Sequence, residues 1–260
     1  MITTYALNGI DLDNNSMGTH LQAESKPKPG IERRTVTVSG GGRDGNVPVP
    51  QSSESPVIAL VVRVPEASEE AFLALLSSPS LTLTHDGRDA VVELLAAASE
   101  FGFLFTDYTC LFRVPGMFWR DPTVTTTTAV AISSASVVVD VMSGLSAPVR
   151  DAIVRIKGGV TNPKVTDSQG SSFQYIGVLP ATSWLRFHSD TGRAYTTTTD
   201  VWTGGTEVTG VVLNGPTVYP LELTPKFTDP TIRAAQFTVT TTARTGTPTV
   251  EIRGKRAYRV

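Results

Sequence analysis

Short apolar runs and polar residues alternate through the first half of the chain, and turn-forming residues separate the runs. Residues 57–64 form a valine-rich run with the length of one buried strand. Residues 81–85 and 88–95 flank Asp86-Gly87, and an Asp-Gly pair between alternating segments is a strong hairpin signal. Residues 109–114 add another strand-like run. This pattern predicts several paired strands before residue 122.

One segment follows the helical period instead. Its acidic residues come first, and Phe72, Leu75 and Leu76 then fall on one face of a helix. Pro79 ends the segment, so we expect one α-helix near residues 66–77. Residues 90–99 leave two alternatives, because their alanines suit a helix while their place in the hairpin favours a strand.

The chain between residues 35 and 56 combines a strand signal with glycine and proline. Residues 35–38 predict a strand, and the glycine-rich residues 39–46 predict a turn or loop. That loop lacks the lysine-hydroxyl pair of a phosphate-binding loop, so we expect no nucleotide there. Residues 47–56 hold three prolines and predict an extended, exposed connection.

After Pro122 the pattern changes to short β-branched runs only, and 27 of the 36 threonines lie there. The runs recur about every ten residues, and this spacing is typical of a β-sandwich. We therefore expect a mainly β protein with two domains. Residues 1–122 form a β domain with the one α-helix, and residues 123–260 form a β-sandwich.

Composition narrows the function classes. Of the 260 residues, 22 are basic and 24 acidic, and this near balance argues against a general nucleic-acid binder. The apolar run 57–62 is too short to cross a bilayer, and the N-terminus lacks a signal-peptide pattern. We expect a soluble protein that neither inserts into membranes nor recognises a nucleic-acid sequence.

Cysteine and histidine are scarce. The single cysteine, Cys110, rules out an intrachain disulfide and a multi-cysteine zinc site, and its apolar neighbours predict a small buried side chain. The three histidines, His20, His85 and His188, are far apart in the sequence. We therefore predict no metal site and no bound cofactor.

Candidate catalytic groups lack the arrangement that catalysis needs. The sequence has no Gly-x-Ser-x-Gly motif, and His188, Ser189 and Asp190 are turn neighbours that point in different directions. Glu207, Glu222 and Glu251 lie in or near predicted strands and are the candidate carboxylates of a hydrolase. Because none has a marked partner, we predict no catalytic residue and no enzyme.

The three tryptophans differ in their surroundings. Trp184 shares a short predicted strand with Leu185 and Phe187, so we expect it in a core or on a sheet face. Trp202 precedes Thr203-Gly204-Gly205 in a predicted loop. Exposed aromatic rings stack on sugars, and Trp202 is therefore the candidate glycan contact.

The order of the pieces resembles a known family. A β domain with one helix ends in a Pro-x-x-x-Trp-Arg-Asp-Pro segment, and a threonine-rich sandwich follows. The segments that carry the resemblance are residues 5–11, 36–40, 42–45, 81–95, 111–122, 153–158, 162–165 and 170–175. In this order they are similar to the distal tail protein family of long-tailed bacteriophages, whose members are often called minor tail proteins.

The resemblance implies a fold, a place and a set of partners. It implies that the first domain is the belt hub of a homohexameric ring and that the second is an outward, galectin-like sandwich. The ring joins the tail tube protein to the tail-tip or baseplate hub and the C-terminal end of the tape-measure protein. A receptor-binding protein or a cell-wall glycan is a further partner. The protein is then a structural virion protein, made in the host cytoplasm and located at the distal end of the tail.

A ring of this kind also needs contacts between its subunits. We expect subunit contacts at Phe118, at Trp119 and along the arm of residues 47–56, with Val47, Val49 and Pro50. Two other functions remain open. One is a carbohydrate-binding module that engages the host surface, which is compatible with the tail role. The other is a hydrolase that uses the three glutamates named above.

Overall fold

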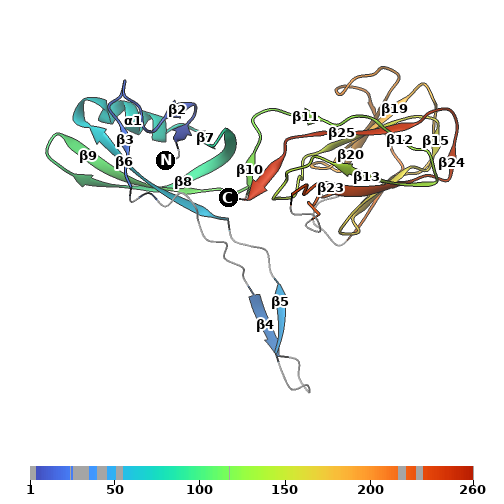
Figure 1. Ribbon diagram of the computed structural model, residues 1–260, viewed down its shortest axis with the longest axis horizontal. Helices are drawn as coiled ribbons and strands as arrows, with labels where there is room; N and C mark the ends of the chain where they lie inside the picture. The colour runs from blue at the N-terminus through green and yellow to red at the C-terminus, as the bar shows by residue number, and fades with distance from the viewer. Residues whose placement is uncertain are drawn as a thin grey trace. The chain divides into compact units, whose positions relative to one another are not determined.

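The computed structural model describes residues 4–23, 25, 35–39, 46–50, 55–116, 118–215, 221–226 and 231–259 (Figure 1). For residues 35–39 and 46–50 it describes the backbone but not the side chains. Strands make up most of the described structure, which holds one α-helix (Figure 1). The prediction of a mainly β fold with one helix is confirmed.

The chain forms two compact units. Unit 1 is Met1–Trp119 with Val260, and unit 2 is Arg120–Arg259. Each unit has its own buried apolar residues. The boundary between the units lies after Trp119, whereas the expected domain boundary lies between residues 122 and 123. That domain boundary stays a prediction.

Unit 1 is built on an antiparallel sheet with the strand order β2-β1-β7-β8-β9-β6-β3. Its strands are β1 (Tyr5–Leu7), β2 (Ile10–Asp11), β3 (His20–Leu21), β6 (Val57–Pro65), β7 (Leu81–His85), β8 (Arg88–Phe101) and β9 (Phe105–Arg113), and β10 (Phe118–Arg120) follows them. In β6 every second residue is buried, from Ile58 to Val64. This two-residue period places one face of the strand in the core.

The hairpin of β7 and β8 turns at the predicted Asp86-Gly87 pair. Both residues have positive φ, 50° and 71°, as a type I′ turn requires. Strand β8 then continues beyond β7 and pairs with β9 from Glu93 to Phe101. Residues 90–99 are therefore strand rather than helix, because pairing with two neighbours outweighs the helix preference of alanine.

The helix covers one side of this sheet. It consists of a 3₁₀ turn, η1 (Glu66–Ser68), and α1 (Glu69–Leu76), where we expected a helix near residues 66–77. Phe72 and Leu76 are buried, and the Phe72 ring lies 5.4 Å from the ring of Tyr108 on β9. The Tyr108 hydroxyl also donates a hydrogen bond to Glu69 at the start of α1. These contacts fix the first half of the helix to the sheet.

A separate hairpin joins β4 (Thr35–Ser39) to β5 (Asn46–Pro50). Pro48 lies opposite Thr37, and Pro50 lies opposite Thr35. Prolines at alternate positions suit a two-stranded hairpin, because every second N–H points away from the partner strand. The expected extended connection at residues 47–56 thus begins as a paired strand. The side chains of Val47, Val49 and Pro50, and residues 51–54, lie outside the described parts.

Unit 2 contains two larger sheets and one small sheet. Their strand orders are β11-β25-β14-β19-β20-β21 with β12 beside β25, β13-β23-β16-β17-β22, and β18-β15-β24. The Phe173 ring on β17 stacks on the Phe187 ring on β19 with centroids 3.8 Å apart. Inner faces of the two larger sheets thus pack together, which makes unit 2 a β-sandwich (Figure 1). Its galectin-like character stays a prediction.

The strands of unit 2 are short. They are β11 (Thr125–Thr126), β12 (Val130–Ala131), β13 (Ser136–Val141), β14 (Ile153–Lys157), β15 (Val160–Thr161), β16 (Lys164–Asp167), β17 (Ser172–Tyr175), β18 (Val178–Leu179), β19 (Trp184–His188), β20 (Arg193–Thr197), β21 (Thr206–Glu207), β22 (Val211–Asn214), β23 (Ala235–Thr240), β24 (Ala243–Arg244), β25 (Thr249–Gly254) and β26 (Ala257–Arg259). This matches the pattern of short β-branched runs in the sequence.

One buried carboxylate holds the turn after β16. Asp167 is 5% exposed and accepts hydrogen bonds from the backbone N–H groups of Gln169, Ser171 and Glu222, each at 2.9 Å. A buried polar group is tolerated when it is hydrogen-bonded in this way. Asp167 is therefore a structural residue of the sandwich.

Candidate functional site

One face of the sheet around β14 and β19 carries a row of directly opposed charged and aromatic residues. From β25 to β21 the row consists of Glu251, Arg155, Arg186, Tyr195 and Glu207. Directly opposed residues of antiparallel strands share a face, and like charges in this relation repel each other. The row therefore sets two arginines side by side in the middle of the sheet.

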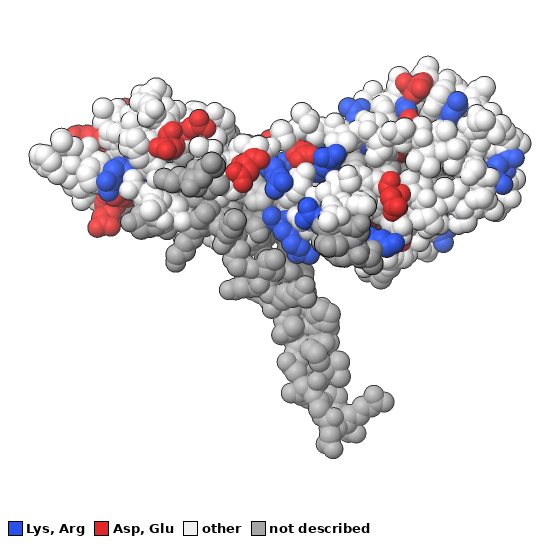
Figure 2. All heavy atoms as spheres, viewed as in Figure 1, with Lys and Arg blue, Asp and Glu red and all other residues white. Residues whose placement is uncertain are grey.

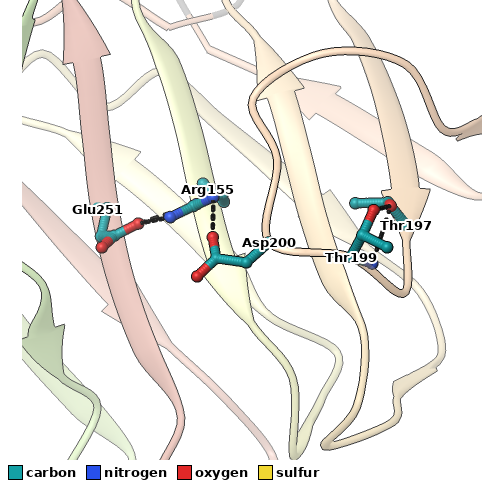
Figure 3. A network of polar contacts seen from close by, with 5 residues as sticks. All are labelled: Arg155, Thr197, Thr199, Asp200 and Glu251. Atoms are coloured by element: carbon teal, nitrogen blue, oxygen red, sulfur yellow. Dashed lines mark hydrogen bonds and ion pairs between the residues drawn. The ribbon is translucent and has the colours of Figure 1, made fainter.

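Arg155 is compensated by two carboxylates. Its Nε donates to Glu251 at 2.8 Å, and its Nη1 donates at 2.5 Å to Asp200, which reaches over from the loop after β20 (Figure 3). The Trp202 ring lies 4.2 Å from the Arg155 guanidinium, within cation–π distance. The Arg155 side chain is only 7% exposed, so this charge is both buried and paired.

Arg186 has no such compensation. The residue is 1% exposed, and its Nε and Nη2 lack a hydrogen-bond partner among the described residues. The Tyr195 ring lies 5.9 Å from its guanidinium. Burial, and then the positive charge of Arg155, lower the pKa of Arg186 below its ordinary value. A buried charge without a partner is destabilising, so this position needs an explanation.

A pocket of about 330 Å³ lies at this arginine. Its lining comes from Ile153, Arg186, His188 and Tyr195 on three adjacent strands and from residues 202–205 of the loop after β20. The volume is at the lower end of the range for small-molecule sites, which suits a ligand of monosaccharide size or less. Trp202, the predicted glycan contact, thus lines a pocket.

The loop after β20 closes over the face because glycine allows a close approach. A Cβ atom on Gly205, whose φ is +93°, would lie 2.6 Å from the Thr196 carbonyl oxygen and 3.2 Å from Arg186 Nη2. At the start of the loop, the hydroxyls of Thr197 and Thr199 are hydrogen-bonded at 2.9 Å (Figure 3). Gly205, in the turn at residues 203–205, therefore lies against the unpaired edge of Arg186.

His188 contributes little charge to the pocket at neutral pH. Burial is the main cause that lowers its pKa below the ordinary value of 6.5, Asp190 acts in the opposite direction, and Arg186 lowers it further. Its ring lies 5.4 Å from the ring of Tyr195. Ser189 Oγ lies 2.7 Å from the Ala152 carbonyl oxygen and donates to the backbone, so it serves the fold.

The three candidate glutamates of a hydrolase each face an arginine. The pairs are Glu207 with Arg193 at 3.6 Å, Glu222 with Arg150 at 2.9 Å, and Glu251 with Arg155. Glu207 and Glu251 stand at opposite ends of the cross-strand row, with three strands between them. They do not form the facing pair that glycoside hydrolysis uses.

Cysteine and histidine lie apart in the fold. Cys110 is buried on β9, and burial raises the pKa of its thiol to about 12. His20 Nδ1 lies 3.0 Å from Asp13, and the His85 ring stacks on Tyr5 at 4.2 Å. The described residues contain no cluster of three or more His, Cys, Asp or Glu side chains that could hold a metal ion. No helix in the described ranges has the length and apolar character for crossing a membrane.

The two predicted aromatic contacts of unit 1 are buried within the chain. Phe118 is 8% exposed and Trp119 is 5% exposed. The Trp119 ring lies 6.5 Å from Tyr5 and 5.7 Å from His85. Burial leaves both side chains little surface for a neighbouring subunit. Their role in subunit contacts stays a prediction.

The most exposed large apolar side chains described in unit 1 lie elsewhere, at the end of the β8–β9 hairpin. Phe101, Phe103 and Leu104, which we call the apolar hairpin tip, are 84%, 86% and 68% exposed. Leu104 has a φ of 70°, which is rare for a leucine. Figure 2 shows mostly uncharged atoms at the left end of unit 1, where Figure 1 draws this hairpin. The sequence patterns did not predict this surface.

Arg186 was missed as well. A signal was present in residues 184–188, because Leu185 and Phe187 are buried in the sandwich core and the residues that alternate with them face the other way. Strand alternation places Arg186 and His188 on the face of Trp184. The sequence did not reveal that a loop covers this face.

Comparison with solved structures finds this fold in a phage protein. The crystal structure of the SPP1 Dit (gp 19.1) protein, described as a paradigm of the hub adsorption apparatus in phages that infect Gram-positive hosts, matches with a TM-score of 0.60 and 16% identity. The match covers 98% of this chain and 99% of that chain. A chain of the phage P2 baseplate in its activated conformation with Ca matches with a TM-score of 0.40 and 13% identity over 98% of both chains, too weakly to carry an argument.

Sequence comparison adds no relative. No protein family and no curated protein matches this sequence. The structural match at 16% identity shows a shared fold and leaves the function to be argued from the molecule. The chain has the fold of SPP1 Dit over nearly its whole length.

Proposed function

We propose that this chain is a structural protein of a bacteriophage tail tip, a distal tail protein that assembles into a homohexameric ring. The observation that carries the proposal is the shared fold with SPP1 Dit, which extends over 98% of the chain and includes both units. The order of segments in the sequence supports the same assignment independently. A tail-tip role needs binding surfaces rather than a catalytic site.

The apolar hairpin tip supports an assembly role. Phe101 and Phe103 expose more than four fifths of their surface to water, although each gains about 2 kcal/mol when buried. Clustered apolar surface of this kind marks protein–protein contact sites. A closed ring requires two different matching patches on each subunit. We propose the tip as one of them and the arm of residues 47–56 as part of the other.

The partners follow from the proposed place in the tail. Unit 1 forms the ring, and unit 2 projects outward as a galectin-like sandwich. The ring joins the tail tube protein to the tail-tip hub and to the C-terminal end of the tape-measure protein, with a receptor-binding protein as a further partner. The protein is made in the host cytoplasm and ends in the virion, at the distal end of the tail.

Absolute mass in solution tests the ring. Light scattering after size exclusion is expected to give six times the chain mass of 27.7 kDa, with ring-shaped particles in negative stain. The double variant Phe101→Ser with Phe103→Ser is expected to lower the mass to that of one chain. The control, Val138→Ser with Val178→Ser, changes side chains of unit 2 that are 58% and 66% exposed and should leave the ring intact. A wild-type monomer that also fails to form rings with tail tube protein would overturn the proposal.

A second candidate function is carbohydrate binding by unit 2. The observation in its favour is that Trp202 and Tyr195 both line the 330 Å³ pocket. Aromatic rings at a concave site are suited to stacking on sugars. Binding to a panel of bacterial wall glycans that Trp202→Ala abolishes would support this function, and a panel without any binding would exclude it.

A further inference from the structure

We infer that the pocket at Arg186 binds an oxyanion, a carboxylate or phosphate group carried by a ligand no larger than a monosaccharide. The inference starts from a charge that the described chain leaves uncompensated. Arg186 is 1% exposed and lines the pocket, and two of its nitrogens have no hydrogen-bond partner in the described parts of the chain. The proposed ring role of unit 1 neither requires nor explains this feature.

The unpaired edge of Arg186 has a defined shape. Its Nε and Nη2 form the side of the guanidinium that holds a carboxylate with two parallel hydrogen bonds. Arg63 in unit 1 uses these two nitrogens to hold Asp107, at 2.9 Å and 2.8 Å. Arg155 uses the same two on Glu251. The missing partner of Arg186 therefore has the geometry of a carboxylate or a phosphate.

The neighbouring carboxylates are already engaged. Glu251 and Asp200 both accept hydrogen bonds from Arg155, and Glu207 pairs with Arg193. Directly across from Arg186 stand Arg155 and Tyr195, neither of which is a carboxylate. An anion that enters the pocket would therefore meet one uncompensated positive charge in a site of low dielectric, where its attraction is strong.

The pocket walls suggest what carries the anion. Tyr195 and Trp202 line it, and the Trp202 ring is held by Arg155 at 4.2 Å and by Arg253 at 5.7 Å. An indole ring held in place beside the Arg186 guanidinium suits a ligand that combines a sugar ring with an anionic group, such as a sugar acid or a sugar phosphate. The contact with a sugar ring rests on the carbohydrate-binding candidate, whereas the contact with the oxyanion stands without it.

Access runs through the turn at residues 203–205. Thr203, Gly204 and Gly205 are exposed and line the pocket, and Gly205 lies at the covered edge of Arg186. Both unpaired nitrogens are closed to solvent, so a bound anion takes the place of the contact that the turn now makes. We therefore expect anion binding to alter the amide signals of these three residues.

Calorimetric titration of the full chain tests the inference with four probes. Inorganic phosphate, glucuronate and glucose 6-phosphate carry the oxyanion, and glucose is the neutral control. Glucuronate separates a carboxylate source from the phosphate source. We expect binding of at least one of the anionic probes and none of glucose. Arg186→Met is expected to weaken that binding by about 10- to 150-fold, the loss of hydrogen bonds to a charged group.

Two controls keep the result specific. Arg193→Met removes another positive charge from the same sheet face, where Arg193 is 60% exposed, and should change binding less than about twofold. Arg186→Met removes a buried unpaired charge, so its melting temperature should equal or exceed that of the wild type. A loss of binding with this stability cannot come from unfolding.

Three outcomes would overturn the inference. They are no binding of any anionic probe to the wild type, equal binding to wild type and Arg186→Met, and glucose binding as tightly as glucuronate. The last outcome would reject the oxyanion and leave the carbohydrate-binding candidate standing. None of them bears on the ring, which is tested by mass.

Discussion

Arg63 in unit 1 and Arg186 in unit 2 both lie on a sheet with a residue of the next strand directly opposite. Opposite Arg63 stands Asp107, and the two form a forked ion pair at 2.8 Å and 2.9 Å. Opposite Arg186 stand Arg155 and Tyr195, and neither offers it a carboxylate. The Arg63 side chain is 39% exposed, whereas Arg186 is 1% exposed. The arginine with more water around it is the one with a partner.

This difference separates a structural charge from a functional one. A partly exposed ion pair carries a small desolvation cost and stabilises its sheet by up to about 1 kcal/mol. A buried charge without a partner lowers stability and persists only where something else requires it. Unit 1 has its own unfavourable feature, the apolar hairpin tip in water. An outside partner would therefore stabilise both features, the exposed hairpin tip of unit 1 and the unpaired edge of Arg186 in unit 2.

Removing a carboxylate partner of the buried Arg155 should have the largest effect. Glu251→Ala leaves the 7% exposed Arg155 with Asp200 alone, which is 66% exposed, and should cost about 3 kcal/mol of the free energy of unfolding. Urea unfolding followed by tryptophan fluorescence measures this loss. Glu207→Ala, which removes a 53% exposed carboxylate, is the control and should cost less than about 1 kcal/mol. Equal losses in the two variants would contradict the burial argument.

Removing each of the two compared arginines should have opposite effects. Arg186→Met is expected to raise the free energy of unfolding by about 1–3 kcal/mol, because a buried unpaired charge becomes an apolar side chain. Arg63→Met is expected to lower it by about 1 kcal/mol or less, because it breaks the pair with Asp107. The same urea unfolding measures both. If Arg186→Met were destabilising, Arg186 would have a partner that we have not identified.

The pH dependence of stability should differ between the two units, and this effect should be smaller than those of the substitutions above. The hydrogen bond from Arg63 lowers the pKa of Asp107 below 3.8, so its contribution is present above that pH and is lost as the pH falls further. Burial lowers the pKa of His188 below 6.5, so the folded state disfavours its protonation and unit 2 loses stability as the pH falls below that value.

Two variants test this separation. His188→Gln should flatten the stability curve as the pH falls below about 6.5. Asp107→Asn should flatten it only below about pH 4. Thermal unfolding across a pH series gives both curves. A His188→Gln curve that still falls with the wild type below pH 6.5 would show that another group titrates there.

Local patterns in the sequence were enough for the elements whose partners are close along the chain. Asp86-Gly87 predicted a hairpin, and its turn has two positive φ angles. The acidic start and the apolar face of the segment near residue 70 predicted a helix, and α1 covers Glu69–Leu76. These elements depend on backbone preferences and on contacts within a few residues, which the sequence states directly.

The sequence by itself determined the mainly β character, the single helix, and the place of Trp202 in a loop. Only the tertiary structure decided that Arg155, Arg186 and Glu251 stand in one row, because strands far apart in sequence supply them. It also decided that Phe118 and Trp119 are buried while Phe101 and Phe103 are exposed. Burial and charge compensation depend on which strands become neighbours, and strand pairing over long separations is not encoded in any local pattern.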